Sequence, residues 1–256
     1  MDFLDATVTR RRHDAAMTIA DRAVLVTGAN RGLGQALVEE ALRRGAKRVY
    51  AGTRRPFSPR DGRVTPLTLD VTDAAQIQGA VEQVESLDIL INNAGLALQD
   101  ALHEREMLER HLAVNLFGTY GVTQAFLPLL TRSRGAIVNV LSLAALTPSP
   151  PLPAYSISKA AAFSLSQSLR ARLAGRGVRV HAVLPGPVDT DMVRDLDIPM
   201  VAIPKASPES VARAIFDGVD NGEEDIFPDP LSESLAENWR SWAKALERPN
   251  VDLIER

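Results

Sequence analysis

The chain has 256 residues with a net charge of −3, 45% hydrophobic and 24% charged residues, and no cysteine. This length fits one large α/β domain or two small ones and is ample for a buried core, and the composition is ordinary for a soluble globular protein. The small charge gives no reason to expect nucleic acid or an anionic membrane as a partner. The absence of cysteine excludes disulfides and thiolate chemistry and fits a cytoplasmic protein. No apolar run approaches the roughly 20 residues that a transmembrane helix needs.

The first 20 residues contain three consecutive arginines, Arg10 to Arg12, which could belong to a targeting signal. No apolar segment follows them, and Asp5 and Asp14 add negative charge, which argues against a signal or transit peptide. We therefore predict a flexible N-terminal extension over 1–20, followed by a single domain over 21–256.

Short β-branched runs recur along the rest of the chain. They are continuously apolar rather than alternating, as expected for parallel strands buried on both faces, and segments with helical periodicity lie between them. Such βαβ units predict an α/β Rossmann fold, a doubly wound parallel sheet of about seven strands with helices on both faces. The expected strands cover 23–27, 48–52, 64–69, 87–92, 136–141, 178–184 and 225–227.

Three helices have clear start or stop signals in the sequence. The helix after the first strand ends in Arg43 and Arg44, which suit the negative C-terminal end of the helix dipole, and Gly45 is expected to stop it. Asp73 is the expected N-cap of a second helix. A third helix should begin after Ser207, with a proline at its first position.

The first strand runs into TGANRGLG, which places glycines at 28, 32 and 34 immediately before a helix. Such a loop needs glycine where the chain turns sharply, where the backbone approaches a pyrophosphate and where the helix packs on the strand. It could also be no more than a tight turn, but its position between a first strand and a helix predicts dinucleotide binding. The loop residues expected at the cofactor are Gly28, Asn30, Arg31, Gly32, Leu33 and Gly34.

Four later motifs complete a pattern. NNAG begins at Asn92, Ser142 follows the fifth strand, YSISK runs from Tyr155 to Lys159, and PGPVDT begins at Pro185. Together with the glycine loop, their order and spacing resemble the classical short-chain dehydrogenase/reductase family over about residues 20–230, in its NADP(H)-preferring, carbonyl-reductase-like form. The resemblance implies an NADP(H)-dependent oxidoreductase that acts on CH–OH or C=O groups.

Tyr155 and Lys159 are four residues apart, so on a helix they share one face. A free tyrosine has a pKa of about 10, and a neighbouring ammonium group favours tyrosinate and is expected to lower that pKa. Tyr155 is therefore the candidate general acid for reduction, or base for oxidation. Alone, the pair could be surface residues of an amphipathic helix. The resemblance also makes Lys159 a donor to the nicotinamide ribose, which places both residues at the cofactor.

By the same resemblance, the Ser142 hydroxyl polarises the substrate carbonyl, and Asn115 binds a water that connects Lys159 to solvent. Asparagine inside a helix is locally unfavourable, which is consistent with a special task. Simpler interpretations stay open: Ser142 could be a helix cap, and Asn115 a packing residue or the site of a helix bend. No metal site is expected, and the catalytic set is Asn115, Ser142, Tyr155 and Lys159.

Position in the family pattern assigns further cofactor contacts. Asp70 would accept a hydrogen bond from the adenine amino group with Val71 beside it, although Asp70 could instead be a charge at a helix N-terminus. The wall of the adenosine ribose pocket is expected to include Asn92, Ala94 and Gly95. The nicotinamide end is expected to contact Pro185, Gly186, Val188 and Thr190.

The type of dinucleotide is predicted from Thr53, Arg54 and Arg55, which follow the second strand. NAD-binding folds place a ribose-binding acid about 20 residues beyond the glycine loop, and here no acid is present. A guanidinium at Arg54 suits the dianionic 2′-phosphate of NADP(H), with Thr53 beside it. The resemblance assigns a second basic contact to Arg31, whereas Arg55 could face water.

Two segments should border the substrate. The stretch 143–154 contains four prolines, which predict a rigid wall with few amide donors, and the loop over about 189–205 could close as an apolar lid. Both could equally be ordinary packed loops. If both segments border the substrate, they favour a hydrophobic ketone or aldehyde. The apolar residues of the lid are Met192, Val193, Leu196, Ile198, Met200 and Val201.

A C-terminal helix is expected over about 231–247, and its apolar stripe needs a core or another subunit to cover it. The resemblance favours a homotetramer, with a dimer as the alternative. The predicted function is NADPH-dependent reduction of a ketone or aldehyde to an alcohol by direct hydride transfer, with the tyrosine as proton donor. An alcohol dehydrogenase working oxidatively and a non-catalytic NADP-binding regulator are the alternatives. The stripe comprises Leu235, Trp239, Trp242 and Leu246.

Overall fold

The computed structural model describes residues 17–55, 57–196 and 204–239. One parallel sheet runs through them in the strand order β3-β2-β1-β4-β5-β6-β7. The predicted doubly wound α/β fold is confirmed, and every strand end lies within two residues of the expected one. The strands are β1 (Ala23–Thr27), β2 (Arg48–Thr53), β3 (Val64–Thr68), β4 (Ile89–Asn92), β5 (Ala136–Val140), β6 (Arg179–Val183) and β7 (Asp225–Ile226).

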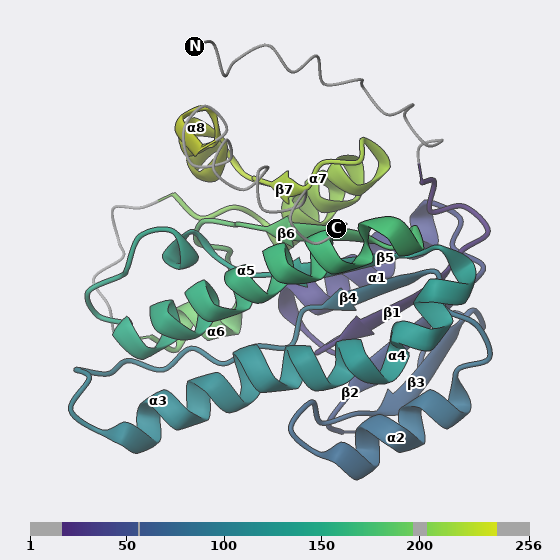
Figure 1. Cartoon of the computed structure of the whole chain (residues 1–256), viewed down its shortest axis with the longest axis horizontal. Helices are drawn as coiled ribbons and strands as arrows, with labels where there is room; N and C mark the ends of the chain where they lie inside the picture. The colour runs from purple at the N-terminus through teal and green to yellow at the C-terminus, as the bar shows by residue number, and fades with distance from the viewer. Residues whose placement is uncertain (1–16, 56, 197–203, 240–256) are drawn as a thin grey trace, which may run out of the picture.

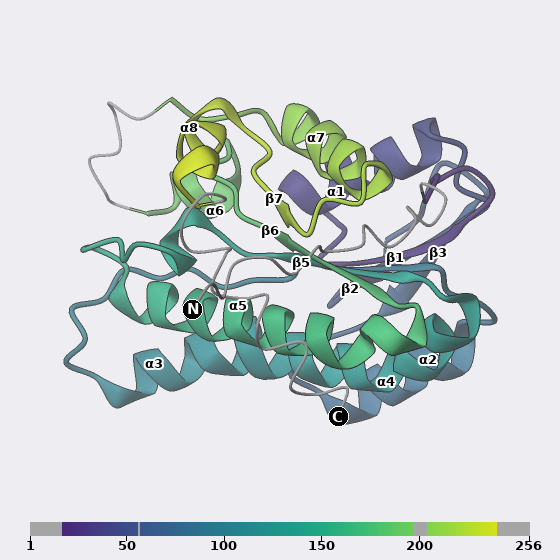
Figure 2. The same cartoon turned by 45° about the horizontal axis from the view of Figure 1, so that its top comes forward.

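Helices cover both faces of the sheet (Figures 1 and 2). One face carries α1 (Gly32–Arg43) and α7 (Pro208–Asp220), and the other carries α2 (Ala74–Gln83), α4 (Thr119–Ser133) and α5 (Pro153–Leu173). Before α4, helix α3 (Arg105–Leu112) continues into a π-helical segment, η1 (Ala113–Gly118). The shorter elements are the 3₁₀ turns η2 (Leu143–Ala145) and η3 (Ala174–Arg176) and the helices α6 (Asp191–Arg194) and α8 (Pro230–Asn238).

The local signals in the sequence act as predicted. Gly45 adopts a φ of +82° just beyond α1, where only glycine is unstrained. Asp73 accepts hydrogen bonds from two backbone amides of α2, and Ser207 accepts one from α7. Pro66 is tolerated in β3 because this strand lies at the edge of the sheet.

The packed structure begins earlier than predicted, and the described residues cover only the first part of the expected last helix. Met17 and Ile19 are buried at 3% and 2% exposure, so the last residues of the expected 1–20 extension already belong to the core. At the other end, Trp239 packs against Phe163 with ring centroids 5.3 Å apart, whereas Leu235 is exposed. Trp242 and Leu246 lie outside the described residues. Among the residues described, no helix is both long enough and apolar enough to cross a membrane.

Arg44 ties α1 to α7. Its side chain is 15% exposed and pairs with Glu40 at 2.7 Å, Asp217 at 2.6 Å and Asp220 at 2.8 Å. Arg44→Leu is expected to lower the free energy of unfolding by about 2 kcal/mol, because it removes both ion pairs to α7 and leaves the part-buried Asp220 without its partner. Urea denaturation measures this. Arg43→Leu is the control, since exposed Arg43 shares the Glu40 carboxylate; an equal loss in both variants would contradict the assignment to the α1–α7 contact.

Candidate active site

The carboxyl ends of the parallel strands lie together along one edge of the sheet, and the predicted site residues follow those ends. The glycine loop follows β1, Arg54 follows β2, Asp70 follows β3, and Asn92 ends β4. Ser142 lies shortly after β5, and the segment beginning at Pro185 follows β6. Ligands of open α/β sheets bind at this edge, so the fold gathers the predicted residues where a dinucleotide site would be.

The glycine loop leaves the N-terminus of α1 open. Gly28 and Gly32 have φ values of +66° and +52°, and a Cβ at Gly34 would collide with the carbonyl oxygen of Gly28. Arg31, at the N-cap position, makes no side-chain cap, and the first turn of α1 contains no acid. The exposed amide donors therefore fit an anion. Leu33, by contrast, is buried in the core, so only its backbone can face a cofactor.

Asn93 holds the glycine loop, and sequence reasoning did not select it. Its Nδ2 donates to the carbonyls of Thr27 at 2.9 Å and Gly28 at 3.3 Å. In return, the Thr27 hydroxyl accepts from the amides of Asn93 and Ala94, both at 3.0 Å. This exchange fixes the loop after β4 against the loop after β1.

The predicted role of Asn92 in the ribose-pocket wall needs correction. Its Nδ2 donates to Thr123 at 3.0 Å and to Asn139 at 2.9 Å, and the residue is 3% exposed. The side chain therefore ties β4 to α4 and β5 inside the protein. Asn92 can contribute to a cofactor site only through its backbone, whereas Ala94 and Gly95 do lie beyond the end of β4.

Tyr155 and Lys159 lie on α5, close to Ser142. Lys159 Nζ is 5.6 Å from the centroid of the Tyr155 ring and donates to the carbonyl of Val140 at 2.9 Å. The Ser142 hydroxyl accepts from the amide of Ala144 at 3.1 Å, which caps η2, and it also forms a hydrogen bond with the Tyr155 side chain. The cap interpretation and the contact with Tyr155 therefore hold together.

The pKa of Tyr155 is shifted opposite to the prediction. Burial is the largest influence and raises the pKa of Tyr155, while the hydrogen bond with Ser142 works against it. Burial also lowers the pKa of Lys159 to about 8. The predicted lowering of the Tyr155 pKa by Lys159 is wrong here, because desolvation penalises tyrosinate and ammonium alike. Tyr155 therefore keeps its proton at neutral pH.

Asn115 sits within the π-helical segment η1 and is 2% exposed. Its Nδ2 donates to the carbonyl of Leu96 and to the Ser158 hydroxyl, and its Oδ1 accepts from the Leu96 amide, each at 2.8 Å. Both amide N–H groups are thus used within the protein, which favours the helix-bend and packing interpretation for the side chain. π-Bulges of this kind are common at functional sites.

A hydrogen bond to Asp229 holds the segment after β6 in place. Gly186 donates from its backbone to Asp229 at 2.8 Å, and Asp229 also caps α8. Val188 is 7% exposed and packs in the core, so its side chain does not face the edge. Thr190 does: its methyl carbon lies 3.1 Å from where a Cβ on Gly32 would be. Pro185 bonds through its carbonyl to the start of η2.

Charged residues flank this edge. Arg31 NH1 lies 3.4 Å from Asp191 Oδ2, and Arg194 pairs with both Asp189 and Asp191. Arg54 is exposed beyond β2, directly after buried Thr53. The contact between Arg31 and Asp191 ties the glycine loop to α6.

Residues 70 and 71 have different surroundings. The carboxylate of Asp70 accepts from the amide and hydroxyl of Thr72 at 2.9 Å and 2.7 Å. It is Asp73, rather than Asp70, that caps α2. Val71 is buried against η1, where a Cβ on Gly118 would come within 2.7 Å of it.

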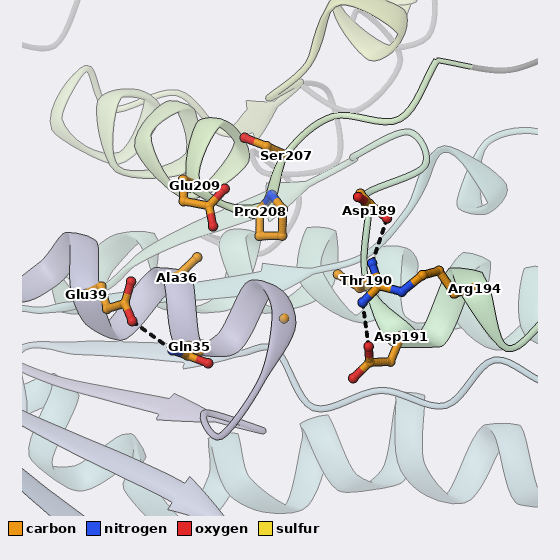
Figure 3. A pocket seen from close by; sticks show the side chains of 11 residues that line it. Gln35, Ala36, Glu39, Asp189, Thr190, Asp191, Arg194, Ser207, Pro208 and Glu209 are labelled. Atoms are coloured by element: carbon orange, nitrogen blue, oxygen red, sulfur yellow. Dashed lines mark hydrogen bonds and ion pairs between the residues drawn. The ribbon is translucent and has the colours of Figure 1, made fainter.

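A pocket of about 380 Å³ opens between α1, α6 and the start of α7 (Figure 3). It meets the glycine loop at Gly32 and the segment after β6 at Thr190. Its charged lining is mostly acidic and includes a single arginine, so it does not suit a phosphate. The charged side chains are Glu39, Asp189, Asp191, Arg194 and Glu209.

Comparison with known proteins identifies the family. The family model described as short chain dehydrogenase matches residues 22–199. The chain belongs to this family. As a short-chain dehydrogenase it is an oxidoreductase acting on CH–OH groups.

Relatives and solved structures agree with this assignment. The chain is 34% identical over 225 residues to 3-oxoacyl-(acyl-carrier-protein) reductase FabG of Thermotoga maritima, covering 78% of this chain and 91% of that protein. It is 38% identical over 187 residues to 2,3-dihydro-2,3-dihydroxybenzoate dehydrogenase of Escherichia coli, covering 70% and 75%. A short chain dehydrogenase from Burkholderia cenocepacia J2315, solved in complex with NADP, superposes with a TM-score of 0.81 at 37% identity, covering 90% and 97%.

Proposed function

We propose that this short-chain dehydrogenase is an NADPH-dependent reductase that converts a hydrophobic ketone or aldehyde to an alcohol. The observation that carries the proposal is the meeting of Tyr155, Lys159 and Ser142 at the same sheet edge as an open glycine loop. A relative solved with NADP supports the choice of cofactor.

The residues at the sheet edge fit NADP(H). The uncapped N-terminus of α1 offers amide donors to a pyrophosphate, and Arg54 offers a guanidinium to a 2′-phosphate. Arg31 is the second candidate for that phosphate and would have to exchange its contact with Asp191. NADPH, when bound, supplies a hydride to the carbonyl carbon.

Tyr155 is proposed to donate the proton to the carbonyl oxygen. Because burial raises its pKa, the phenol is protonated at neutral pH, which suits reduction better than oxidation. The Ser142 hydroxyl can stabilise negative charge that develops on that oxygen. Lys159 is held beside the Tyr155 ring by its bond to Val140, and is proposed to donate to the nicotinamide ribose. Asn115 is proposed to act by positioning its neighbours.

The apolar surroundings of Ser142 support a hydrophobic substrate. Leu143, Ala145 and Leu146 follow it and pack, part-buried, on a cluster that includes residues of α5, β6 and α8. In the proposed lid, Met192, Val193 and Leu196 are half-buried, whereas Ile198, Met200 and Val201 lie outside the described residues.

The proposed activity is tested by following NADPH consumption over a panel of ketones, aldehydes and quinones, repeated with NADH. We expect turnover with apolar carbonyls, faster with NADPH than with NADH. Activity only with alcohols and NADP⁺ would favour the oxidative alternative. A flat panel in a protein that still binds NADPH would overturn the reductase and favour a non-catalytic regulator.

We also propose a homo-oligomer, a tetramer or a dimer. Phe117 and Tyr120 are 62% and 49% exposed on η1 and α4, and Ile157 is 40% exposed on α5, which packs beside η1. Large apolar side chains gathered on neighbouring elements commonly mark an interface. Light scattering measures the mass in solution, and a monomer would contradict this proposal.

The remaining proposals concern context. We propose that the chain from Met17 onward forms one domain, since Met17 and Ile19 are already buried in its core. We also propose that the protein works in the cytoplasm on a small carbonyl or alcohol substrate, with neither nucleic acid nor membrane as partner. The cysteine-free sequence and the net charge of −3 support this. Cell fractionation tests the location, and limited proteolysis tests the domain.

A further inference from the structure

Residues 95–100 form a segment, here called the strap, that leads from β4 toward α3 and borders the candidate catalytic residues. At its start, a Cβ on Gly95 would lie 3.4 Å from Asn115 Oδ1 and 3.7 Å from Lys159 Nζ. Small size at Gly95 thus allows the strap to pass close to both side chains.

Two side chains of the α3–η1 helix bind the strap like a neighbouring strand. Asn115 bonds both the amide and the carbonyl of Leu96 at 2.8 Å, and His111 Nε2 accepts from the amide of Leu98 at 3.0 Å. One helical turn advances about 5.4 Å and two residues of extended chain about 6.6 Å. Side chains four residues apart on a helix can therefore follow alternate residues of an extended strap.

The far end of the strap holds the start of the helix that carries Tyr155. Asp100 Oδ2 accepts from the amide of Ala154 at 3.2 Å, and the Asp100 amide donates to the carbonyl of Pro151 at 3.4 Å. The residue at the N-cap position of α5, Leu152, provides no side-chain cap. Asp100 therefore supplies the missing cap from another segment, one residue before Tyr155.

His111 is fully buried, and its two ring nitrogens have opposite roles. Nδ1 lies 2.7 Å from the carbonyl of Met107, which can only accept, and Nε2 faces the amide of Leu98, which can only donate. The imidazole is therefore neutral, with its proton on Nδ1. Its ring meets the ring of Tyr155 edge-on, with centroids 6.5 Å apart and planes at 70°.

We propose that His111 is a positioning residue for Tyr155: it contacts the tyrosine ring directly and fixes the strap whose Asp100 caps the tyrosine's helix. The inference rests on the proposed function of Tyr155 as proton donor. It goes beyond that function because it gives a task to a histidine outside the catalytic set.

The test compares three variants in the full chain with NADPH and 4-nitrobenzaldehyde as the probe carbonyl. His111→Phe keeps an aromatic ring but removes the acceptor, and we expect kcat to fall about 10- to 100-fold while KM and the NADPH Kd change less than about twofold. His111→Gln restores an acceptor and should recover most of kcat. His103→Phe, at an exposed histidine of the same connection, is the control and should match the wild type.

Hydrogen exchange gives a readout that does not need turnover. His111→Phe should speed exchange at the amides of both Leu98 and Ala154, and His111→Gln should protect them again. Asp100→Ala should speed exchange at Ala154 and lower kcat in the same way. Unchanged kcat in His111→Phe, or faster exchange at Leu98 alone, would overturn the proposal. If the wild type does not reduce the probe, the proposed function is in doubt for that substrate, and exchange at Ala154 then decides whether His111 holds the start of α5.

Discussion

Tyr155→Phe is expected to bind NADPH with unchanged affinity and to reduce a test carbonyl about 10²- to 10⁴-fold more slowly, the range typical for removal of a general acid. The phenyl ring preserves the edge contact with His111 and the packing beside Lys159. What is lost is the hydroxyl, with its hydrogen bond to Ser142 and its proton. Stopped-flow single-turnover rates measure the chemical step, and fluorescence titration measures NADPH binding.

The matched control for this prediction is Tyr120→Phe. Tyr120 lies on α4 and is 49% exposed, so loss of its hydroxyl should leave both rate and affinity unchanged. A reductase rate in Tyr155→Phe equal to that of the wild type would remove the tyrosine from the chemistry. A parallel loss of NADPH affinity would instead assign the hydroxyl to cofactor binding.

Elements with local causes could be predicted from the sequence. The strands of this sheet are buried on both faces, so each appears as a short continuous apolar run, and β1 is buried at every position. The caps at Asp73 and Ser207 involve only amides two or three residues away. The glycine loop also has a local cause, because Gly34 packs directly against the backbone of Gly28 within the same loop.

The choice between Asn92 and Asn93 shows where residue-by-residue transfer from a family pattern fails. Successive side chains of a strand point to opposite faces. The side chain of Asn92 points to the same face of the sheet as Leu90, which packs on the α4 side of the core. The side chain of Asn93 points to the same face as Ile91, which packs on the α1 side. Alternation in β4 was therefore a usable signal for Asn93, the residue that binds the glycine loop.

Contacts between distant segments carried no such signal. Asp100 caps α5 across 54 residues, and Arg31 pairs with Asp191 across 160. The pKa of Tyr155 also depends on burial by several elements, which a spacing of four residues to Lys159 does not reveal. Charge proximity could be predicted from the sequence, but its competition with desolvation required the packed structure.

Arg54→Asp is expected to weaken NADPH binding about 100-fold while changing NADH binding less than about threefold. A charge-assisted hydrogen bond to an ionised group contributes about 1.5–3 kcal/mol, or about 10- to 100-fold in affinity. A carboxylate in its place adds repulsion against the dianionic phosphate. NADH lacks that phosphate, so its affinity serves as the internal reference. Calorimetric titration with both dinucleotides measures the ratio.

Arg55→Asp separates direct contact from a general charge effect, because it makes the same change in charge one residue further along. Both arginines are exposed, but the backbone carbonyl of Arg55 is held by the Thr53 hydroxyl at 2.6 Å, which fixes the turn between them. If Arg54 contacts the 2′-phosphate, Arg55→Asp should lower NADPH affinity only a few-fold, and less still at high salt. Equal losses in the two variants would indicate a diffuse field rather than a contact. An equal loss of NADPH and NADH affinity in Arg54→Asp would contradict the role of Arg54 in selecting the cofactor. Arg31 would then be the remaining candidate, and binding the phosphate would require it to give up its contact with Asp191.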